Sequence, residues 1–450
     1  MTRNHHNAEK CSSTKTRPLG NMELSWTRAV SCGTGTTVLA LQMAKPISEV
    51  PLLHEILLKL QKAHPLLRSK LHYDPTRNTF SFLTSPTPKI DIKIHNLQST
   101  SNLLKILSSK QTSDVSPCHL ILEHELNSKF WCDPKSFPCN GIEVLFASVY
   151  ALSDTKSIVM LRLHVSMCDR TTAVSLLREL LELVEESEGG RVRSGIKNDG
   201  EGNMGIENMI PSGMGKKTLW AHGVDMLGYS VNSLRLTNLK FENTKLPRSS
   251  EVVRLQMDTQ RTSRILAIYD KTKSSQIHIS SEFIKPLMKL FINKCSVPNF
   301  SGFYHSAILN IHTLNGTENF WDLAKRIHTD FTYYKTRNKH FSDMADLNFL
   351  MNKDLENPSL TASSSLRTSL ISVFEDPVID NTKQMQREIG VEDYLGCASI
   401  HGVGPSIAVF DTIRDGELDC ACVYPAPLHS REQINEVVGH MRRILIDGSS

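Results

Sequence analysis

The sequence has no long hydrophobic run. None of its 450 residues lies in a stretch approaching the 18 or so consecutive apolar residues of a membrane-spanning helix. The polar N-terminal segment, residues 1–18, also lacks the apolar core of a secretory signal peptide, and we expect a disordered tail there. These absences favour a cytoplasmic protein that has no membrane partner.

An excess of charge of one sign is missing as well. The chain has 51 Lys and Arg against 47 Asp and Glu, so its formal net charge is only +4. Such a small charge, interspersed along the chain, does not indicate a surface for nucleic acid. With 40% hydrophobic and 22% charged residues, the composition is that of an ordinary globular protein.

Cysteines spaced as metal ligands are absent. The ten cysteines are scattered, and the pairs Cys420 with Cys422 and Cys132 with Cys139 have no matching second pair of ligands. Cys420 and Cys422 alternate within a strand pattern, which places both on one face. We therefore expect reduced, buried thiols, and neither a metal nor a bound cofactor.

Composition divides the chain into four parts. We expect a disordered tail over residues 1–20, a first lobe over 21–185, a flexible linker with bridging helices over 186–250, and a second lobe over 251–450. Between Glu185 and Gly215, eight glycines lie among polar and charged residues, a composition typical of linkers.

Strand and helix patterns are mixed in both halves. Strands are indicated at 36–43, 142–150, 157–164, 252–257, 303–311, 365–374, 405–410 and 417–423, and an edge strand is indicated to begin at 66–71. Helices are indicated at 53–60, 173–184, 220–239, 258–270, 281–293, from 320 onward, and at 431–446. This mixture predicts an α/β or α+β fold with two lobes of similar size.

One strand-to-helix junction carries the candidate site. The apolar strand at 157–164 ends in His164, and Asp169 follows five residues later at the start of a leucine-rich helix. An Asp in that position accepts backbone N–H bonds as a helix cap, and a His at a strand end is equally compatible with a core residue. Residue chemistry alone favours these structural roles.

The junction resembles the HHxxxDG motif of condensation domains and BAHD-type acyltransferases, the superfamily typified by chloramphenicol acetyltransferase. A second segment, His64-Pro-Leu-Leu-Arg68, is similar to the HPxLR segment that follows the first helix in that superfamily. Further segments at 23–26, 33–36, 302–308 and 320–326 look like those of a little-characterised plant branch, so the resemblance covers roughly residues 20–447.

The resemblance implies a monomer of two chloramphenicol-acetyltransferase-like lobes with a channel between them. In active relatives the second His of the motif deprotonates a hydroxyl or amine acceptor, which attacks a thioester of coenzyme A or a carrier. Asp169 would then be structural, and Arg170, Thr368 or Ser369 would contact the small-molecule donor or acceptor. Here Val165 occupies the position of that His, and Arg170 occupies that of the Gly. The BAHD motif DFGWG is absent.

Two functions follow from this comparison. The first is an acyltransferase that uses a coenzyme A thioester as co-substrate, with His164 or a recruited group as the base. The second is a catalytically silent relative whose channel binds a ligand or a protein, because a Val cannot accept a proton. On a strand, His164 and Val165 point to opposite faces, so the first does not simply replace the second.

Overall fold

The computed structural model describes residues 14–46, 49–109, 115–189, 205–235, 239–274, 319–357, 366–372, 389–414 and 416–448. The helix expected at 281–293 and the strand expected at 303–311 lie outside these residues. Residues 190–204 of the Gly-rich stretch lie outside them too, whereas residues 185–189 belong to a helix and residues 205–215 are described.

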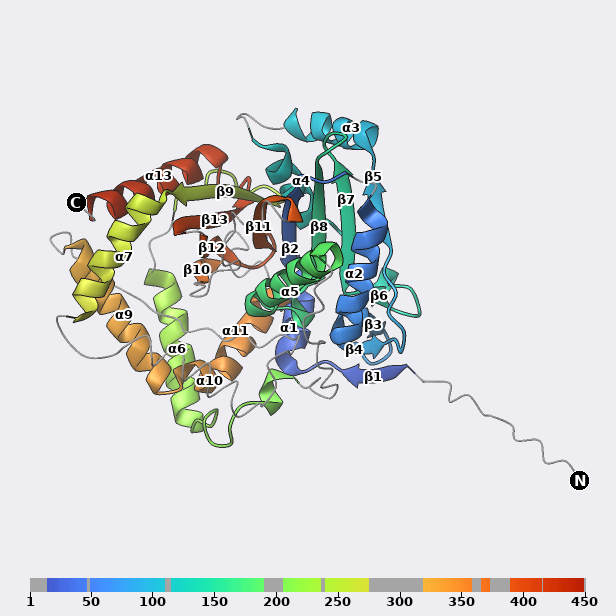
Figure 1. Ribbon diagram of the computed structural model, residues 1–450. Helices are drawn as coiled ribbons and strands as arrows, with labels where there is room; N and C mark the ends of the chain where they lie inside the picture. Colours follow the sequence, from blue (N-terminus) through green and yellow to red (C-terminus); the bar gives the residue numbers. More distant parts are fainter. Residues whose placement is uncertain are drawn as a thin grey trace, which may run out of the picture.

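Strands and helices are mixed throughout the described chain (Figure 1). The first half contains β1 (Lys15–Pro18), α1 (Asn21–Ser31), β2 (Thr34–Met43), α2 (Val50–Ala63), β3 (Ser69–Asp74), β4 (Thr79–Thr84), β5 (Ile92–His95), α3 (Leu97–Ser108), α4 (Pro117–Leu126), β6 (Ile142–Glu143), β7 (Leu145–Ala151), β8 (Ser157–His164) and α5 (Arg170–Gly189). The second half contains α6 (Leu219–Arg235), β9 (Ser249–Met257), α7 (Thr259–Ser274), α9 (Phe320–Thr336), α10 (Lys339–Ser342), α11 (Met344–Glu356), β10 (Leu366–Ser372), β11 (Val391–Ile400), β12 (Pro405–Arg414), β13 (Glu417–Ala426) and α13 (Arg431–Asp447). The predicted mixed α/β class is confirmed.

Each half contains a mixed sheet, and the first half also contains an antiparallel sheet with the order β1-β4-β3-β6. The first-half sheet has the order β11-β2-β8-β7-β5, and the second-half sheet has the order β10-β12-β13-β9. In each of these two mixed sheets the strand at one edge is parallel to its neighbour: β5 pairs with β7, and β10 pairs with β12. Strand β11 comes from the second half of the sequence but pairs with β2, so the two halves share a sheet.

The apolar core follows the alternation of the central strands. Leu161 and Leu163 of β8 face one side, where they join a cluster with α2 and α5. Met160 faces the other side, where its cluster includes residues of α4 and of the second-half strands. One face of the first sheet is therefore buried partly against the second half, which fixes how the halves sit together.

Polar contacts reinforce this junction between the halves. The Asn127 side-chain oxygen accepts from the Ser250 backbone N–H at 2.7 Å, and Arg431 Nη2 donates to Glu123 Oε1 at 2.6 Å. Both links connect the α4 region with β9 or α13. Together with the shared core, they hold the cavity described below between fixed walls.

Three local expectations need correction. Strand β1 lies inside the segment expected to be a tail, and it pairs with β4. Strand β3 is an interior strand of the sheet β1-β4-β3-β6 rather than an edge, and a 3₁₀ turn at Pro65–Arg68 precedes it. The strand expected at 142–150 is two strands, β6 and β7, which belong to different sheets. These differences arise from long-range pairing, which local residue patterns do not encode.

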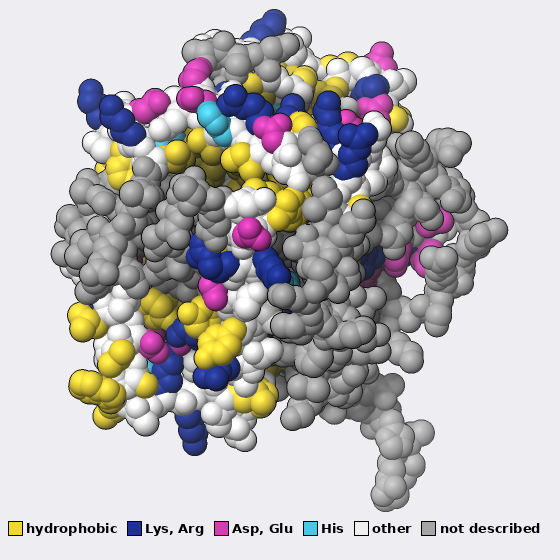
Figure 2. All heavy atoms as spheres, turned by 90° about the vertical axis from the view of Figure 1, so that its left-hand side faces the viewer, with side chains coloured by type: hydrophobic (Ala, Val, Ile, Leu, Met, Phe, Trp, Pro, Cys, Tyr) yellow, Lys and Arg dark blue, Asp and Glu magenta, His cyan; other side chains and the backbone are white. Residues whose placement is uncertain are grey.

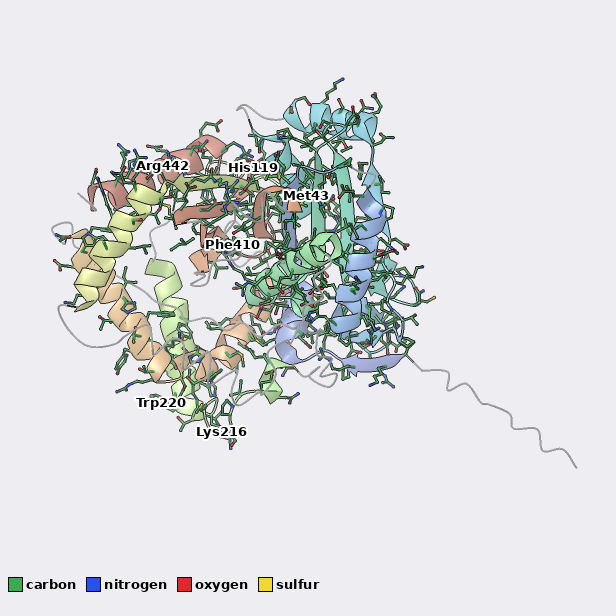
Figure 3. The ribbon with its side chains drawn as sticks, in the orientation of Figure 1. Met43, His119, Lys216, Trp220, Phe410 and Arg442 are labelled. Carbon is green, nitrogen blue, oxygen red and sulfur yellow. The ribbon has the colours of Figure 1, made fainter. Side chains whose placement is uncertain are left out.

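The described surface mixes both signs of charge with scattered hydrophobic side chains (Figure 2). Trp220 lies at the outer end of α6 and is 81% exposed, whereas Phe410 of β12 points toward the middle of the molecule (Figure 3). Among the helices that the structure describes, none combines the length and apolar character needed to cross a membrane.

Candidate functional site

The junction predicted from sequence lies between the two halves. Strand β8 ends at His164, a single 3₁₀ turn covers Val165–Met167, and α5 begins at Arg170. Residues on α1 and β2 pack against this turn. The short turn reverses the chain, so that residues 165 and 170 reach the space between the halves while residue 164 stays with the strand.

His164 is fully buried. Its Nδ1 lies 2.7 Å from Ser166 Oγ, and its ring makes an edge contact with the Trp131 ring at 5.1 Å between centroids. Burial lowers the pKa of His164 to about 3, so the imidazole is neutral at physiological pH. The residue does not line the cavity between the halves, and the structure brings it instead to the α4 side of the sheet.

Val165 takes the opposite direction and lines the cavity wall. It packs in an apolar cluster with Val30 and Trp131. Gly35, with a φ of +105°, makes room for it, because a Cβ on Gly35 would lie only 2.7 Å from Val165 Cγ1. The wall at this point is thus built to fit an aliphatic side chain.

Asp169 forms the N-cap of α5. Its Oδ1 accepts from the Thr172 backbone N–H at 2.8 Å, and its carbonyl accepts from the Ala173 N–H at 2.8 Å. Asp169 and Arg170 both line the cavity. The Arg170 guanidinium carbon lies 5.2 Å from the centroid of the Phe410 ring, so the cation stacks on a wall of the second half.

Thr368 and Ser369 lie on β10, which forms the edge of the second-half sheet next to β12. The side chains of these two residues are outside what the structure describes. Their neighbour Leu370 lines the cavity, so β10 does border the site. A contact of either hydroxyl with a ligand stays a prediction.

The cavity has a volume of about 250 Å³ and draws its walls from both halves. Most lining residues are apolar: Met22, Trp26, Leu39, Val165, Ala173, Val174, Leu177, Met344, Leu347, Met351, Leu370, Leu395, Ile400 and Phe410. The charged residues that line it are Asp169, Arg170 and Asp419. An apolar pocket with a few charged groups suits a small, largely apolar ligand.

The polar groups of this cavity are poor bases and nucleophiles. Asp419 accepts from Arg254 Nε at 2.8 Å and from Arg414 Nη2 at 3.2 Å, which engages both of its oxygens. Burial raises the pKa of the Cys397 thiol to about 12, so the sulfur stays protonated at neutral pH. Within the described part of the chain, no histidine lines the cavity.

Several lining residues were missed by sequence reasoning. Strand β11 supplies Tyr394 and Cys397, and helix α11 supplies Met344, although neither element was expected. A signal was available for Asp419, because a charged residue inside an otherwise apolar strand is costly unless it is paired. No local signal marks β11, since its role depends on pairing with β2.

One acidic cluster has the geometry of a cation site, but a lysine fills it. The carboxylates of Asp225 on α6, Asp343 at the start of α11 and Asp346 on α11 lie close together. Lys217 Nζ lies 2.6 Å from Asp225 and 3.0 Å from Asp346, and it also contacts Asp343. The ammonium group therefore occupies the position a metal would take.

Comparison with solved structures identifies the fold of this chain. No protein-family profile matches the chain, and no curated protein matches it in sequence. Solved structures do match. The first condensation domain of the CDA synthetase superposes with a TM-score of 0.60 at 12% identity, over 97% of this chain and 96% of that one. This chain has the condensation-domain fold.

Other structures agree with this assignment. The EpoB cyclization-docking bidomain from Sorangium cellulosum matches with a TM-score of 0.60 at 10% identity, over 97% of this chain and 85% of that one. Polyketide synthase associated protein 5 from Mycobacterium tuberculosis matches with a TM-score of 0.57 at 13% identity, over 97% and 99%. The predicted architecture of two chloramphenicol-acetyltransferase-like lobes is confirmed.

Proposed function

We propose that this protein binds a small, largely apolar molecule in the cavity between its halves and does not catalyse acyl transfer. The observation that supports this is the direction of two adjacent side chains. Val165 lines the cavity where the resemblance places the catalytic base, and His164 is buried on the other side of the sheet.

The chemistry of acyl transfer explains why this matters. A hydroxyl or amine attacks a thioester efficiently only when a base within hydrogen-bond reach accepts its proton. A valine has no lone pair, and an imidazole with a pKa of about 3 is a very weak base. Asp419 is engaged by two arginines, so it is poorly suited to replace the missing imidazole.

The test is a turnover assay with acetyl- and longer acyl-coenzyme A and a panel of alcohol and amine acceptors. The natural sequence should show no transfer above the uncatalysed rate. The double variant Val165→His with Arg170→Gly should introduce a measurable rate, because it restores both motif positions. Robust turnover by the natural protein would overturn the proposal.

The ligand class is suggested by Arg170. A guanidinium in an apolar cavity favours a ligand with an anionic end, such as a carboxylate or a phosphate of coenzyme A. Calorimetric titration with coenzyme A and acyl-coenzyme A should then show weaker binding to Arg170→Gly. Equal binding to the natural protein and the variant would show that Arg170 only supports the local structure.

An active acyltransferase is the alternative, and it is favoured by the position of the junction at the cavity. In that case the base is His164 after a rearrangement of the 165–167 turn, or a group recruited from elsewhere in the cavity. If His164 is the base, His164→Ala should lower the transfer rate by about 10²–10⁴-fold with little effect on folding. Turnover that survives His164→Ala would point to another base.

The location, the oligomeric state and the closer relatives of the protein can each be tested directly. We propose a cytoplasmic monomer related to BAHD-type acyltransferases, on the strength of the segments at 60–71 and 161–170. We propose that it belongs to a plant branch of them, on the strength of the segments at 23–26, 33–36, 302–308 and 320–326. Light scattering during size-exclusion chromatography tests the monomer. Imaging of a tagged chain in plant cells tests the location.

A further inference from the structure

A buried arginine on β8 has one edge that makes no hydrogen bond to the described residues. Arg162 is only 6% exposed and lies on the α4 side of the first-half sheet. The Phe130 ring lies 4.5 Å from its guanidinium carbon, and the Phe146 ring lies 5.1 Å from it. Because the two aromatic rings lie against the guanidinium, its N–H groups donate hydrogen bonds from the edges of the group.

Within the part of the chain that the structure describes, this guanidinium has a hydrogen-bond partner on one side. Nη1 donates to the Glu125 carboxylate, whose second oxygen accepts from the Tyr150 hydroxyl at 2.5 Å. Nε is buried without a hydrogen-bond partner among the described residues, and Nη2 likewise makes no hydrogen bond to them. The parallel N–H groups of Nε and Nη2 form a fork that matches two carboxylate oxygens.

Arg162 and Tyr150 help to line a second cavity of about 420 Å³ beneath α4. Its walls also include Lys93 of β5, Ser148 of β7 and the Phe130 ring. Burial lowers the pKa of Arg162 from its ordinary value, although the Glu125 charge acts in the opposite direction. The cation is thus incompletely compensated, and a further anion would stabilise it.

We propose that this cavity is a second binding site, which takes a small aromatic carboxylate side-on at the Nε and Nη2 edge of Arg162. The planar fork favours a carboxylate, and the partly exposed Phe130 ring offers an apolar surface to the rest of the ligand. Three carboxylates, Glu123, Glu125 and Glu251, also line the cavity, which disfavours a doubly charged phosphate. Glu123 and Glu251 are themselves held by Arg431, at 2.6 and 3.2 Å.

Benzoate is the probe, measured by calorimetry on the full chain. Benzamide, its uncharged counterpart, should bind about tenfold more weakly, because charge-assisted hydrogen bonds are roughly twice as strong as neutral ones. Arg162→Lys keeps the charge but loses the fork, and it should weaken benzoate binding by about tenfold or more. Inorganic phosphate should not compete.

A set of exposed residues keeps the test independent of folding. Lys93 is exposed at the mouth of the cavity, and Lys93→Glu should weaken benzoate binding by about threefold, the size of a surface charge effect. Lys59→Glu, an exposed lysine on α2 across the sheet, is the matched control and should have no effect.

Four results would overturn the proposal. The first three are an absence of benzoate binding to the natural protein, equal binding of benzamide, and displacement by phosphate. Loss of binding in Arg170→Gly with retention in Lys93→Glu would place benzoate in the cavity between the halves instead. That outcome would support the proposed function while rejecting the second site, so the two ideas fail separately.

Discussion

The cavity between the halves and the cavity beneath α4 use opposite faces of the same sheet. The first is bordered by Thr37 and Leu39 of β2 and by Val165, and most of its lining is apolar. The second is bordered by Arg162, Ser148 and Tyr150, and its lining carries several charged groups. Strand β8 and the turn after it thus present Val165 to one cavity and Arg162 to the other.

The difference between the two cavities shows on which face of the sheet the buried charged and ionisable side chains lie. The cavity between the halves has the aliphatic side chain of Val165 in its wall. The opposite face holds a buried arginine, a buried carboxylate and a neutral histidine. We therefore expect substitutions on the α4 side to cost the most stability, and those around the cavity between the halves to cost less.

Glu125→Ala should have the largest effect. It removes the charge partner of Arg162 and leaves a buried cation beside three aromatic rings, which should lower the free energy of unfolding by about 3–5 kcal/mol. Urea unfolding followed by circular dichroism measures this. Glu356→Ala, which breaks an exposed pair with Lys353, should leave stability almost unchanged. Equal effects of the two substitutions would contradict the contrast.

His164 should make the protein sensitive to acid. Its pKa is depressed from about 6.5 in the unfolded chain to about 3 in the fold, so the unfolded state binds the proton first as pH falls. The stability that the neutral imidazole contributes is complete above pH 6.5 and is lost progressively toward pH 3. Between pH 7 and pH 5 this loss amounts to about 2 kcal/mol.

The measurement is the free energy of unfolding at both pH values. In His164→Gln the loss between pH 7 and pH 5 should be smaller by about that amount. His440→Gln is the control, because this histidine is 56% exposed on α13. An identical pH dependence of His164→Gln and the natural protein would show that the imidazole is accessible to protons in the fold.

Asp169→Ala should have an intermediate effect. It removes the side-chain cap of α5 and leaves the Thr172 N–H without that acceptor, which should lower stability by about 1–2 kcal/mol. Asp169→Asn keeps a capping oxygen and should lower it less. Thermal unfolding of the two variants separates the roles, and an unchanged Tm in Asp169→Ala would show that the cap is dispensable.

Arg170→Met should have the smallest effect. The methionine keeps an aliphatic stem but loses the stacking of the cation on Phe410, worth about 0.5–1 kcal/mol. Phe410→Leu in the same background then tests whether the two losses are coupled. A loss above that of Asp169→Ala would indicate that this cavity depends on buried charge after all.

Much of the fold could be predicted from local patterns. The stripe of Ile434, Val438 and Met441 identified α13, and the hairpin β12–β13 follows from its two strand patterns and the turn between them. The apolar run ending at His164 identified β8, and alternation predicted that His164 and Val165 face opposite sides. These features depend on neighbours within a few residues, where side-chain periodicity is informative.

The rest required contacts between distant residues. The pairing of β11 with β2 joins Tyr394 to Leu41, more than 350 positions apart, and this pairing places Tyr394 and Cys397 at the cavity. The edge of Arg162 that lacks a partner among the described residues was likewise not evident from the sequence, because Glu125 reaches the guanidinium from α4 and Phe130 reaches it from the loop that follows.

The sequence by itself determined the mixed class, most of the regular elements and the junction from His164 to Arg170. Only the tertiary structure decided what that junction does, because burial and direction depend on what packs against each residue. Gly35 fits against Val165, and Trp131 meets His164 at its edge. Those two contacts give an aliphatic wall on one side of the sheet and a neutral, inaccessible imidazole on the other.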